Sequence, residues 1–336
     1  MDYAKFNDRQ ALEIISRYAK PENVRVLYVS SYIPNYVRTE TLLNIFKRNK
    51  IKVVVIRGGA RALRYFSAFF RTIIRLKDCD MLFLAFRAQE MLPFFRIITR
   101  KPIIFDAFVS LYDTLCFDRK VCAPDSILGR VLKWYDAYLC SLADTVLVDT
   151  QTHSEYFKKE FKAKNISYLY VECNTDLFKP LPAPRNTSKF VVFWYGKCWP
   201  LQGVDIILKA AALLKEESGI IFRLVGPVRK KYAHLVEEVH AHNIEYLDYV
   251  AYENLPQEIA KASVCLGGHF SGIEKAKRVI AGKTFQFIAC GKPTIVGDNA
   301  ANRELFSQTQ GLYFTQMNSS ASLAKTILSL KQEMGA

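Results

Sequence analysis

The chain has 336 residues, half of them hydrophobic, which exceeds what one hydrophobic core usually supports, so we expect two domains. The formal net charge of +15 favours phosphates or anionic lipid as partners, and eight cysteines without C-x-x-C or metal spacing favour reduced thiols in a cytosolic protein. The start of the chain lacks the apolar core of a signal peptide, and no uncharged run approaches the ~20 apolar residues of a membrane-spanning helix.

Short apolar runs alternate with helical patterns along the first half of the chain. This alternation is typical of a parallel sheet that is covered by helices on both faces. Each run is bounded by polar or turn residues, as expected of a buried strand. The expected strands are 24–30, 51–56, 81–85, 102–105 and 145–148.

Residues 62–75 predict an amphipathic helix between the second and third of these strands. At ~100° per residue its arginines share one side, and its apolar residues cluster opposite them. We expect most of the apolar residues to pack on the sheet and the arginines to stay outside. A basic, aromatic-rich surface of this kind suits an anionic membrane, which predicts peripheral attachment to the inner face. The arginines are Arg64, Arg71 and Arg75, and the apolar residues are Phe66, Phe70, Ile73 and Ile74.

A break with three prolines at 179–188 predicts an extended linker between two halves. The second half repeats the alternation of strands and helices. We therefore expect an α/β protein with two Rossmann-like, doubly wound domains, 1–178 and 189–318, facing a cleft. A helix at 319–333 is expected to pack back on the first domain. The expected strands of the second half are 190–195, 220–225, 244–247, 264–266 and 294–296.

A strand-to-helix turn with a glycine at each end follows the first strand of the second half. Gly196 allows close approach of the backbone, and Lys197 supplies a compact positive charge. The helix that begins near Gly203 would direct unpaired N–H groups at an anion. The turn predicts phosphate binding, and the alternative is an ordinary turn with an exposed lysine.

The segment 283–298 is the most informative part of the sequence. It predicts a short helix that ends at Gly291, a proline that starts the next element, and a buried strand. A cation-rich approach, 274–278, precedes it, so the start of the helix would meet a diphosphate. Together with the turn at Gly196, this segment resembles the donor-binding segment of a GT-B glycosyltransferase, and it resembles glycosyltransferase family 4 most.

The resemblance implies a nucleotide-diphosphate sugar as donor. Alignment on the Ala-Cys-Gly stretch puts Arg278 and Gln286 where the family has two glutamates. Gln286 could still hydrogen-bond the donor's ribose, whereas Arg278 cannot imitate a carboxylate. Gln202 stands where the family has a lysine that grips the diphosphate. We therefore expect Lys283, with Thr284 beside it, to supply the second phosphate contact, and the alternative is a surface lysine.

Four further positions are candidate site residues. Glu304 matches a family glutamate and supports donor binding or caps a helix. His269, in a glycine-rich loop, could hydrogen-bond phosphate or a sugar hydroxyl, although a lone histidine is more often structural. Asp106 and Asp113 follow a first-domain strand, where a carboxylate could stabilise an oxocarbenium-like transition state. We prefer Asp106, which lies closest to the strand end, and a helix cap is the alternative for both.

The residues as a whole predict a retaining, metal-independent glycosyltransferase without a cofactor, acting on a lipid-linked or cell-envelope glycan. The sequence shows no acidic pair suited to magnesium. A second hypothesis is a catalytically reduced nucleotide-sugar-binding or scaffold subunit of a glycan-assembly complex, because Arg278, Gln286 and Gln202 depart from the family. Nucleic-acid binding is motivated only by the net charge, so we expect no nucleic-acid partner.

Overall fold

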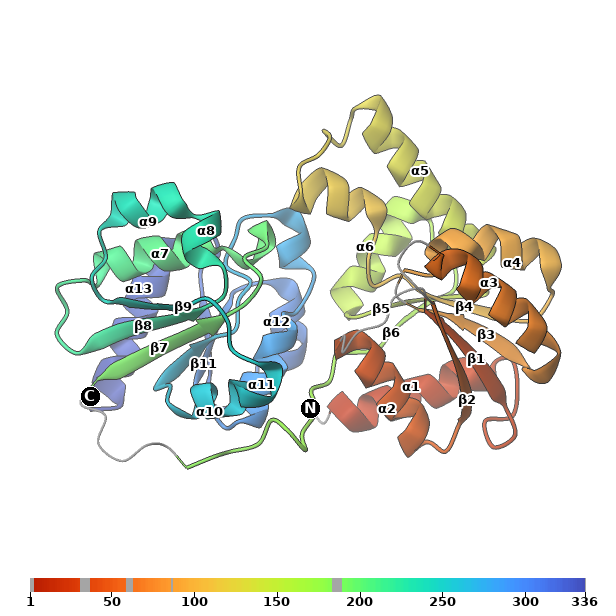
Figure 1. Ribbon diagram of the computed structural model, residues 1–336, viewed down its shortest axis with the longest axis horizontal. Helices are drawn as coiled ribbons and strands as arrows, with labels where there is room; N and C mark the ends of the chain where they lie inside the picture. Colours follow the sequence, from red (N-terminus) through yellow and green to blue (C-terminus); the bar gives the residue numbers. More distant parts are fainter. Residues whose placement is uncertain (1–2, 31–36, 59–62, 86, 183–188, 336) are drawn as a thin grey trace. The chain divides into compact units, whose positions relative to one another are not determined.

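The computed structural model describes residues 3–30, 37–58, 63–85, 87–182 and 189–335. The chain divides into two compact units, Met1–Glu172 and Cys173–Ala336. Within the described residues each unit holds one six-stranded sheet between layers of helices (Figure 1). The expected α/β architecture with two Rossmann-like domains is confirmed, and the division falls ahead of the expected boundary at residue 178.

The sheet of the first unit has the order β2-β1-β3-β4-β5-β6, and its neighbouring strands are parallel. Its three central strands after β1 are buried along their whole length, as expected for parallel strands covered on both faces. The strands are β1 (Arg25–Ser30), β2 (Lys52–Arg57), β3 (Met81–Leu84), β4 (Ile103–Asp106), β5 (Thr145–Val148) and β6 (Ile166–Tyr168).

Two hydrophobic clusters lie on the two faces of this sheet. One cluster joins the sheet to α1 and α2, and the other joins it to α3, α4, α5 and α6. The helices are α1 (Tyr3–Ser16), α2 (Val37–Arg48), α3 (Arg64–Arg75), α4 (Leu92–Ile98), α5 (Ile127–Leu142) and α6 (Gln151–Phe161), with shorter helical turns at η1 (Leu76–Asp78), η2 (Gln89–Met91) and η3 (Asp113–Asp118).

The orientation of α3 differs from the expectation. Its fully buried residues are Ala68 and Thr72, whereas Phe66, Phe70 and Ile74 are 66%, 59% and 67% exposed. The small side chains at 68 and 72 let the helix lie close to the sheet, so the contact face runs along them. The expectation that most of the apolar side packs inward is therefore wrong for these three residues.

The sheet of the second unit has the order β12-β11-β10-β7-β8-β9, again with parallel neighbours. Its core lies between β7, β8 and β10 and the helices α7 and α13. The strands are β7 (Phe190–Tyr195), β8 (Ile220–Val225), β9 (Ile244–Leu247), β10 (Val264–Leu266), β11 (Thr294–Gly297) and β12 (Leu312–Thr315). The helices are α7 (Val204–Leu213), α8 (Val228–Lys231), α9 (Ala233–Val239), α10 (Leu255–Ala260), α11 (Gly282–Ala289), α12 (Ala300–Phe306) and α13 (Ser320–Glu333), with η4 (Pro200–Gln202), η5 (Tyr252–Asn254) and η6 (Glu274–Lys277) between them.

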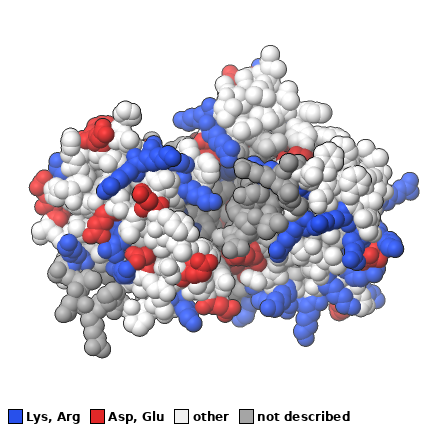
Figure 2. Space-filling model, in the orientation of Figure 1, with Lys and Arg blue, Asp and Glu red and all other residues white. Residues whose placement is uncertain are grey.

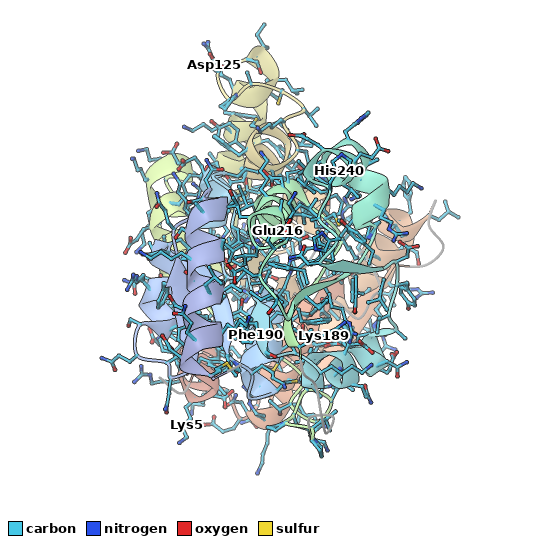
Figure 3. The ribbon with its side chains drawn as sticks, turned by 90° about the vertical axis from the view of Figure 1, so that its left-hand side faces the viewer. Lys5, Asp125, Lys189, Phe190, Glu216 and His240 are labelled. Carbon is cyan, nitrogen blue, oxygen red and sulfur yellow. The ribbon has the colours of Figure 1, made fainter. Side chains whose placement is uncertain are left out.

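The last helix, α13, belongs to the second unit. Its buried residues Leu323, Ile327 and Leu330 lie in one hydrophobic cluster with Phe190 of β7 and with residues of α7. Figure 3, which looks onto this side of the second unit, shows α13 in front of its sheet. The expectation that this helix packs back on the first domain is therefore wrong, because its apolar side completes the second core.

All eight cysteines are free, and all except Cys122 are buried. Burial raises the pKa of Cys290 to about 11, so its thiol is protonated at neutral pH. No helix in the described part of the chain combines the length and the hydropathy needed to cross a membrane.

Candidate functional site

The sheet of the second unit changes direction between β7 and β10. The chain runs from β7 to β8 and β9 on one side, then returns to β10 on the other side of β7. Ligands of such sheets bind outside the carboxyl ends of the strands at this reversal. The two loops that follow these strands, 196–203 and 267–272, therefore mark the candidate site.

Hydrogen bonds hold these two loops together. The Phe270 N–H donates to the Gln202 carbonyl at 3.3 Å, and the Ser271 hydroxyl donates to the Leu201 carbonyl at 2.9 Å. Gly203 begins α7 with a φ of 70°, and a Cβ there would lie 2.6 Å from the Ser271 nitrogen. The close approach of the loops therefore requires glycine at this position.

The Gln202 side chain folds back over its own loop. Its Oε1 accepts a hydrogen bond from the Trp199 N–H at 3.1 Å, and a Cβ on Gly196 would lie 3.0 Å from its amide atoms. Gln202 thus stabilises the turn through contacts within its own loop.

Lys283 brings the second sequence segment to the same place. It is the second residue of α11, is 7% exposed, and its Nζ donates to the Tyr195 carbonyl at the end of β7 at 2.7 Å. The Nζ also lies 4.3 Å from the centroid of the Trp194 ring, which favours a cation. The alternative of a surface lysine is wrong, since the side chain is buried against β7.

Burial lowers the pKa of Lys283 to about 7. The unfolded chain keeps this lysine protonated up to its ordinary value of 10.5, so between these two values the unfolded state binds more protons. The stability of the second unit is therefore expected to rise by a few kcal/mol as the pH increases from neutral towards 10. Urea unfolding across this range should show the rise in the native protein, and Lys283→Met should flatten it. An equal rise in Lys283→Met would contradict the prediction.

Lys197 and Lys231 add positive charge on the outer side of the turn. The Lys197 side chain is exposed, and its backbone carbonyl accepts a hydrogen bond from the Lys231 Nζ at 2.8 Å. That Nζ lies 4.7 Å from the centroid of the Trp199 ring. The position of Lys231, at the end of α8 and beside this turn, was not predicted from the sequence. The run of three cations at 229–231 is the only feature of the sequence that could have indicated it.

Gln286 is held inside the unit. It is 1% exposed, its Oε1 accepts a hydrogen bond from the Tyr195 hydroxyl, and its Nε2 donates to the Tyr252 hydroxyl at 3.1 Å. A ribose contact would require Gln286 to exchange one of these partners, so its geometry favours a structural role. Arg278 is half-buried at the end of η6.

The other expected donor-site residues lie around the same loops. Thr284 is fully buried, and its hydroxyl, below Gly267, has no hydrogen-bond partner among the described residues. His269 is 7% exposed in the loop after β10. Glu304 is half-buried in α12, and the first turn of this helix is capped by Asn299. The roles of these residues in binding or catalysis stay predictions.

Asp106 lies inside the first unit. It ends β4, and its carboxylate accepts hydrogen bonds from the Arg38 guanidinium, with Nη2 at 2.9 Å from Oδ1. Both side chains are fully buried. Burial raises the pKa of the Asp106 carboxyl, and Arg38 opposes this rise. This pairing favours a structural role over the catalytic one that we expected.

Asp113 is also buried, and it accepts a hydrogen bond from the Tyr156 hydroxyl at 2.8 Å. The residue before η3 is Tyr112, so Asp113 lies inside this helical turn and does not precede it. Sequence reasoning missed a neighbouring buried pair, in which the His153 Nδ1 lies 2.6 Å from the Asp149 Oδ1 just after β5. Asp149 lies just before α6 and His153 in its first turn, so the spacing of four residues was the only signal of the pair.

Within the described residues, no group of three or more His, Cys, Asp or Glu side chains is placed to hold a metal ion. Comparison with curated protein sequences finds no significant match. Residues 189–333 match the family model described as Glycosyl transferases group 1.

Three solved structures are similar over nearly the whole chain. The Anabaena protein HepE, in a complex with UDP-glucose, shares 15% identity at a TM-score of 0.65, covering 93% of this chain and 91% of HepE. Sucrose-phosphate synthase from Thermosynechococcus elongatus shares 13% identity at a TM-score of 0.71, covering 93% and 91%. A glycosyltransferase from Rickettsia africae shares 10% identity at a TM-score of 0.62, covering 93% and 89%.

The fold similarity and the two parallel sheets define the fold class: the protein has the GT-B fold.

Proposed function

We propose that the protein transfers a sugar from a nucleoside-diphosphate donor, which binds at the carboxyl ends of β7 and β10. One observation carries the proposal: Lys283, at the start of α11, meets the end of β7 beside the turn that bears Lys197, and Lys231 of α8 is hydrogen-bonded to the same turn. Three cations and the N–H groups of a helix start thus gather where the strand order reverses, and such a place favours a diphosphate. HepE, which has a similar fold, binds UDP-glucose, and this supports a uridine-type donor.

The proposed chemistry follows from the charge of this cluster. When the bond between the sugar C1 and the diphosphate oxygen breaks, negative charge grows on the departing nucleotide. Fixed cations and backbone N–H groups stabilise that charge, which lowers the barrier. A bound diphosphate also raises the pKa of Lys283 and keeps it protonated. Since lysines neutralise the diphosphate, we propose that the reaction needs no metal ion and no cofactor. We also propose that the acceptor oxygen bonds to C1 on the face that the nucleotide leaves, so that the reaction retains the configuration at C1.

The proposed acceptor is a lipid-linked or cell-envelope glycan at the cytoplasmic face of a membrane. The net charge of +15 and the exposed aromatic residues of α3 support this location, because both suit an anionic lipid surface. The enzyme would then act as a peripheral protein, without a nucleic-acid partner.

Removal of the Lys283 side chain tests the donor site. Lys283→Ala is expected to weaken the binding of UDP by about 10- to 100-fold, because a charge-assisted hydrogen bond contributes ~1.5–3 kcal/mol. Isothermal titration calorimetry at neutral pH measures the change. Lys292→Ala is a matched control, since Lys292 is also a partly buried lysine that donates to carbonyls, those of Ala260 and Ala262, but it lies before the amino end of β11. Equal UDP affinity in Lys283→Ala and the native protein would remove Lys283 from the site.

A second candidate function is a nucleotide-sugar-binding subunit with little or no turnover. It is favoured by Arg278 and Gln286, which replace the two glutamates of related enzymes, and by the bonds that hold Gln286 inside the unit. The purified protein with UDP-sugars distinguishes the two functions. Slow donor hydrolysis or sugar transfer favours the enzyme, whereas tight nucleotide binding without any turnover favours the subunit.

A further inference from the structure

Three helices on one face of the first unit's sheet expose apolar side chains at helical spacing. On α3, Phe66, Phe70 and Ile74 follow one another at intervals of four residues. On α4, Ile97 is 84% exposed, and on α5, Ile127 and Trp134 are 84% and 64% exposed. We call these six residues the apolar face. Exposed apolar side chains are common singly, but several large ones on three neighbouring helices suggest an interaction surface.

Side-chain contacts join the three helices into one surface. The Phe69 ring of α3 lies 5.8 Å from that of Phe70 and 6.0 Å from that of Phe94 on α4. The helix α4 packs in turn against α5. On α5 the Trp134 and Tyr138 rings stack with their centroids 5.5 Å apart. The apolar face is therefore built on fixed helices that share one core with the sheet.

The same helices carry more positive than negative charge, although Arg75, Arg96 and Lys133 pair with acidic residues outside them. Asp136 is the only acidic residue within α3, α4 and α5, and it is buried, with its carboxylate bonded to the Ser110 hydroxyl and to backbone N–H groups. Arg71 and Arg130 are exposed and make no ion pair within the described residues. In Figure 2 the region over α5 shows mostly white, uncharged side chains, with blue and some red side chains at its margins. The basic residues of the three helices are Arg64, Arg71, Arg75, Arg96, Arg130 and Lys133.

We propose that this surface docks the protein on an anionic lipid bilayer, with the apolar face entering the headgroup boundary and the arginines contacting lipid phosphates. Aromatic and aliphatic side chains beside Arg and Lys are the composition that such a boundary favours. A second copy of the chain fits less well, because a symmetric pairing would bring the same cations against each other. The inference deepens the proposed function and rests on it for the acceptor, but vesicle binding tests it separately from nucleotide binding.

Vesicle flotation with the full chain tests the proposal. The native protein is expected to float with vesicles of phosphatidylcholine and phosphatidylglycerol, and much less with phosphatidylcholine alone. Phe70→Gln with Trp134→Gln should weaken binding to the mixed vesicles by about tenfold or more, since two large apolar side chains no longer leave water. Arg71→Glu with Arg130→Glu should weaken it by a similar factor, and added salt should weaken binding of the native protein.

A matched control carries the same kinds of change on the second unit. Leu213→Gln with Lys325→Glu alters an exposed leucine of α7 and an exposed lysine of α13, and it should leave vesicle binding unchanged. An equal loss in this control, or full binding in both test variants, would overturn the proposal. The native protein could instead self-associate without binding vesicles, and the Phe70 and Trp134 changes could abolish this self-association. That outcome would overturn the proposal, because the surface would then bind a second copy of the chain.

Calorimetry with UDP on the same preparations separates the two proposals. Nucleotide binding without vesicle binding by the native protein would overturn the docking surface and leave the proposed function standing. Vesicle binding without nucleotide binding would overturn the proposed function and leave the docking surface standing. Since all the test positions lie on exposed helix faces, the variants should keep the thermal stability of the native protein within a few degrees.

Discussion

Asp106→Ala is expected to destabilise the first unit by about 3–5 kcal/mol, which is among the largest effects of any single substitution in this chain. The change leaves the Arg38 guanidinium buried without its counter-charge, since both side chains are fully buried. Arg38 also donates to the Val148 carbonyl at 3.1 Å, so the pair ties α2 to the ends of β4 and β5. Urea unfolding at neutral pH, followed by circular dichroism, measures the loss.

Two further variants separate the buried charge from other causes. Arg38→Leu with Asp106→Leu removes both charges and should recover much of the lost stability. Glu13→Ala breaks an exposed pair with Arg17 on α1 and should cost about 0.5 kcal/mol or less. If Asp106→Ala keeps the native stability and loses sugar transfer, then the structural role is wrong and the catalytic role that the sequence indicated is correct.

Gly226→Ala is expected to destabilise the second unit by about 3 kcal/mol or more and to weaken UDP binding. Gly226 follows β8 with a φ of 132°, which L side chains rarely adopt, and a Cβ there would lie 2.1 Å from the Gly196 carbonyl oxygen. Both the strained backbone and the clash act on the turn that we propose to hold the diphosphate. Thermal unfolding gives the stability, and calorimetry with UDP gives the affinity.

Gly311→Ala separates backbone strain from the steric clash. Gly311 has a φ of 77°, but nothing lies within 4 Å of its Cβ position. The substitution should cost only about 1 kcal/mol, which is the strain of the backbone alone. An equal loss of stability in both variants would show that the contact with Gly196 contributes nothing.

Five expected strands agree with the structure at both ends. They are the runs at 145–148, 190–195, 220–225, 244–247 and 264–266, which form β5, β7, β8, β9 and β10. The edge strands β6 and β12 were not predicted. Both are short and partly exposed, and β6 lacks a continuous apolar run because Ser167 lies at its centre.

The candidate site was predictable where it depends on local chain geometry. The turn at Gly196 and the start of the helix at Lys283 follow strands whose carboxyl ends lie side by side in a doubly wound sheet. The bonds of Gln286 to Tyr195 and Tyr252, and of Asp106 to Arg38, join residues far apart in the chain. No local pattern encodes such pairs, so side chains expected to meet ligand proved to be bonded within the protein.

The orientation of α3 shows a second limit of prediction from sequence. Helical periodicity correctly placed Phe66, Phe70 and Ile74 on one side, but it does not say which side faces the sheet. That choice follows from the small residues Ala68 and Thr72, over which the helix approaches the strands most closely.

The position of α13 predicts the order in which the two units fold during synthesis of the chain. The sheet of the first unit is complete once β6 has left the ribosome, so this unit can fold while the second is still being made. The second core cannot close in the same gradual way, because α7, near its beginning, packs against α13, which is translated much later. Nascent chains stalled before residue 320 should therefore carry a folded first unit and an open second one, which a chaperone would bind.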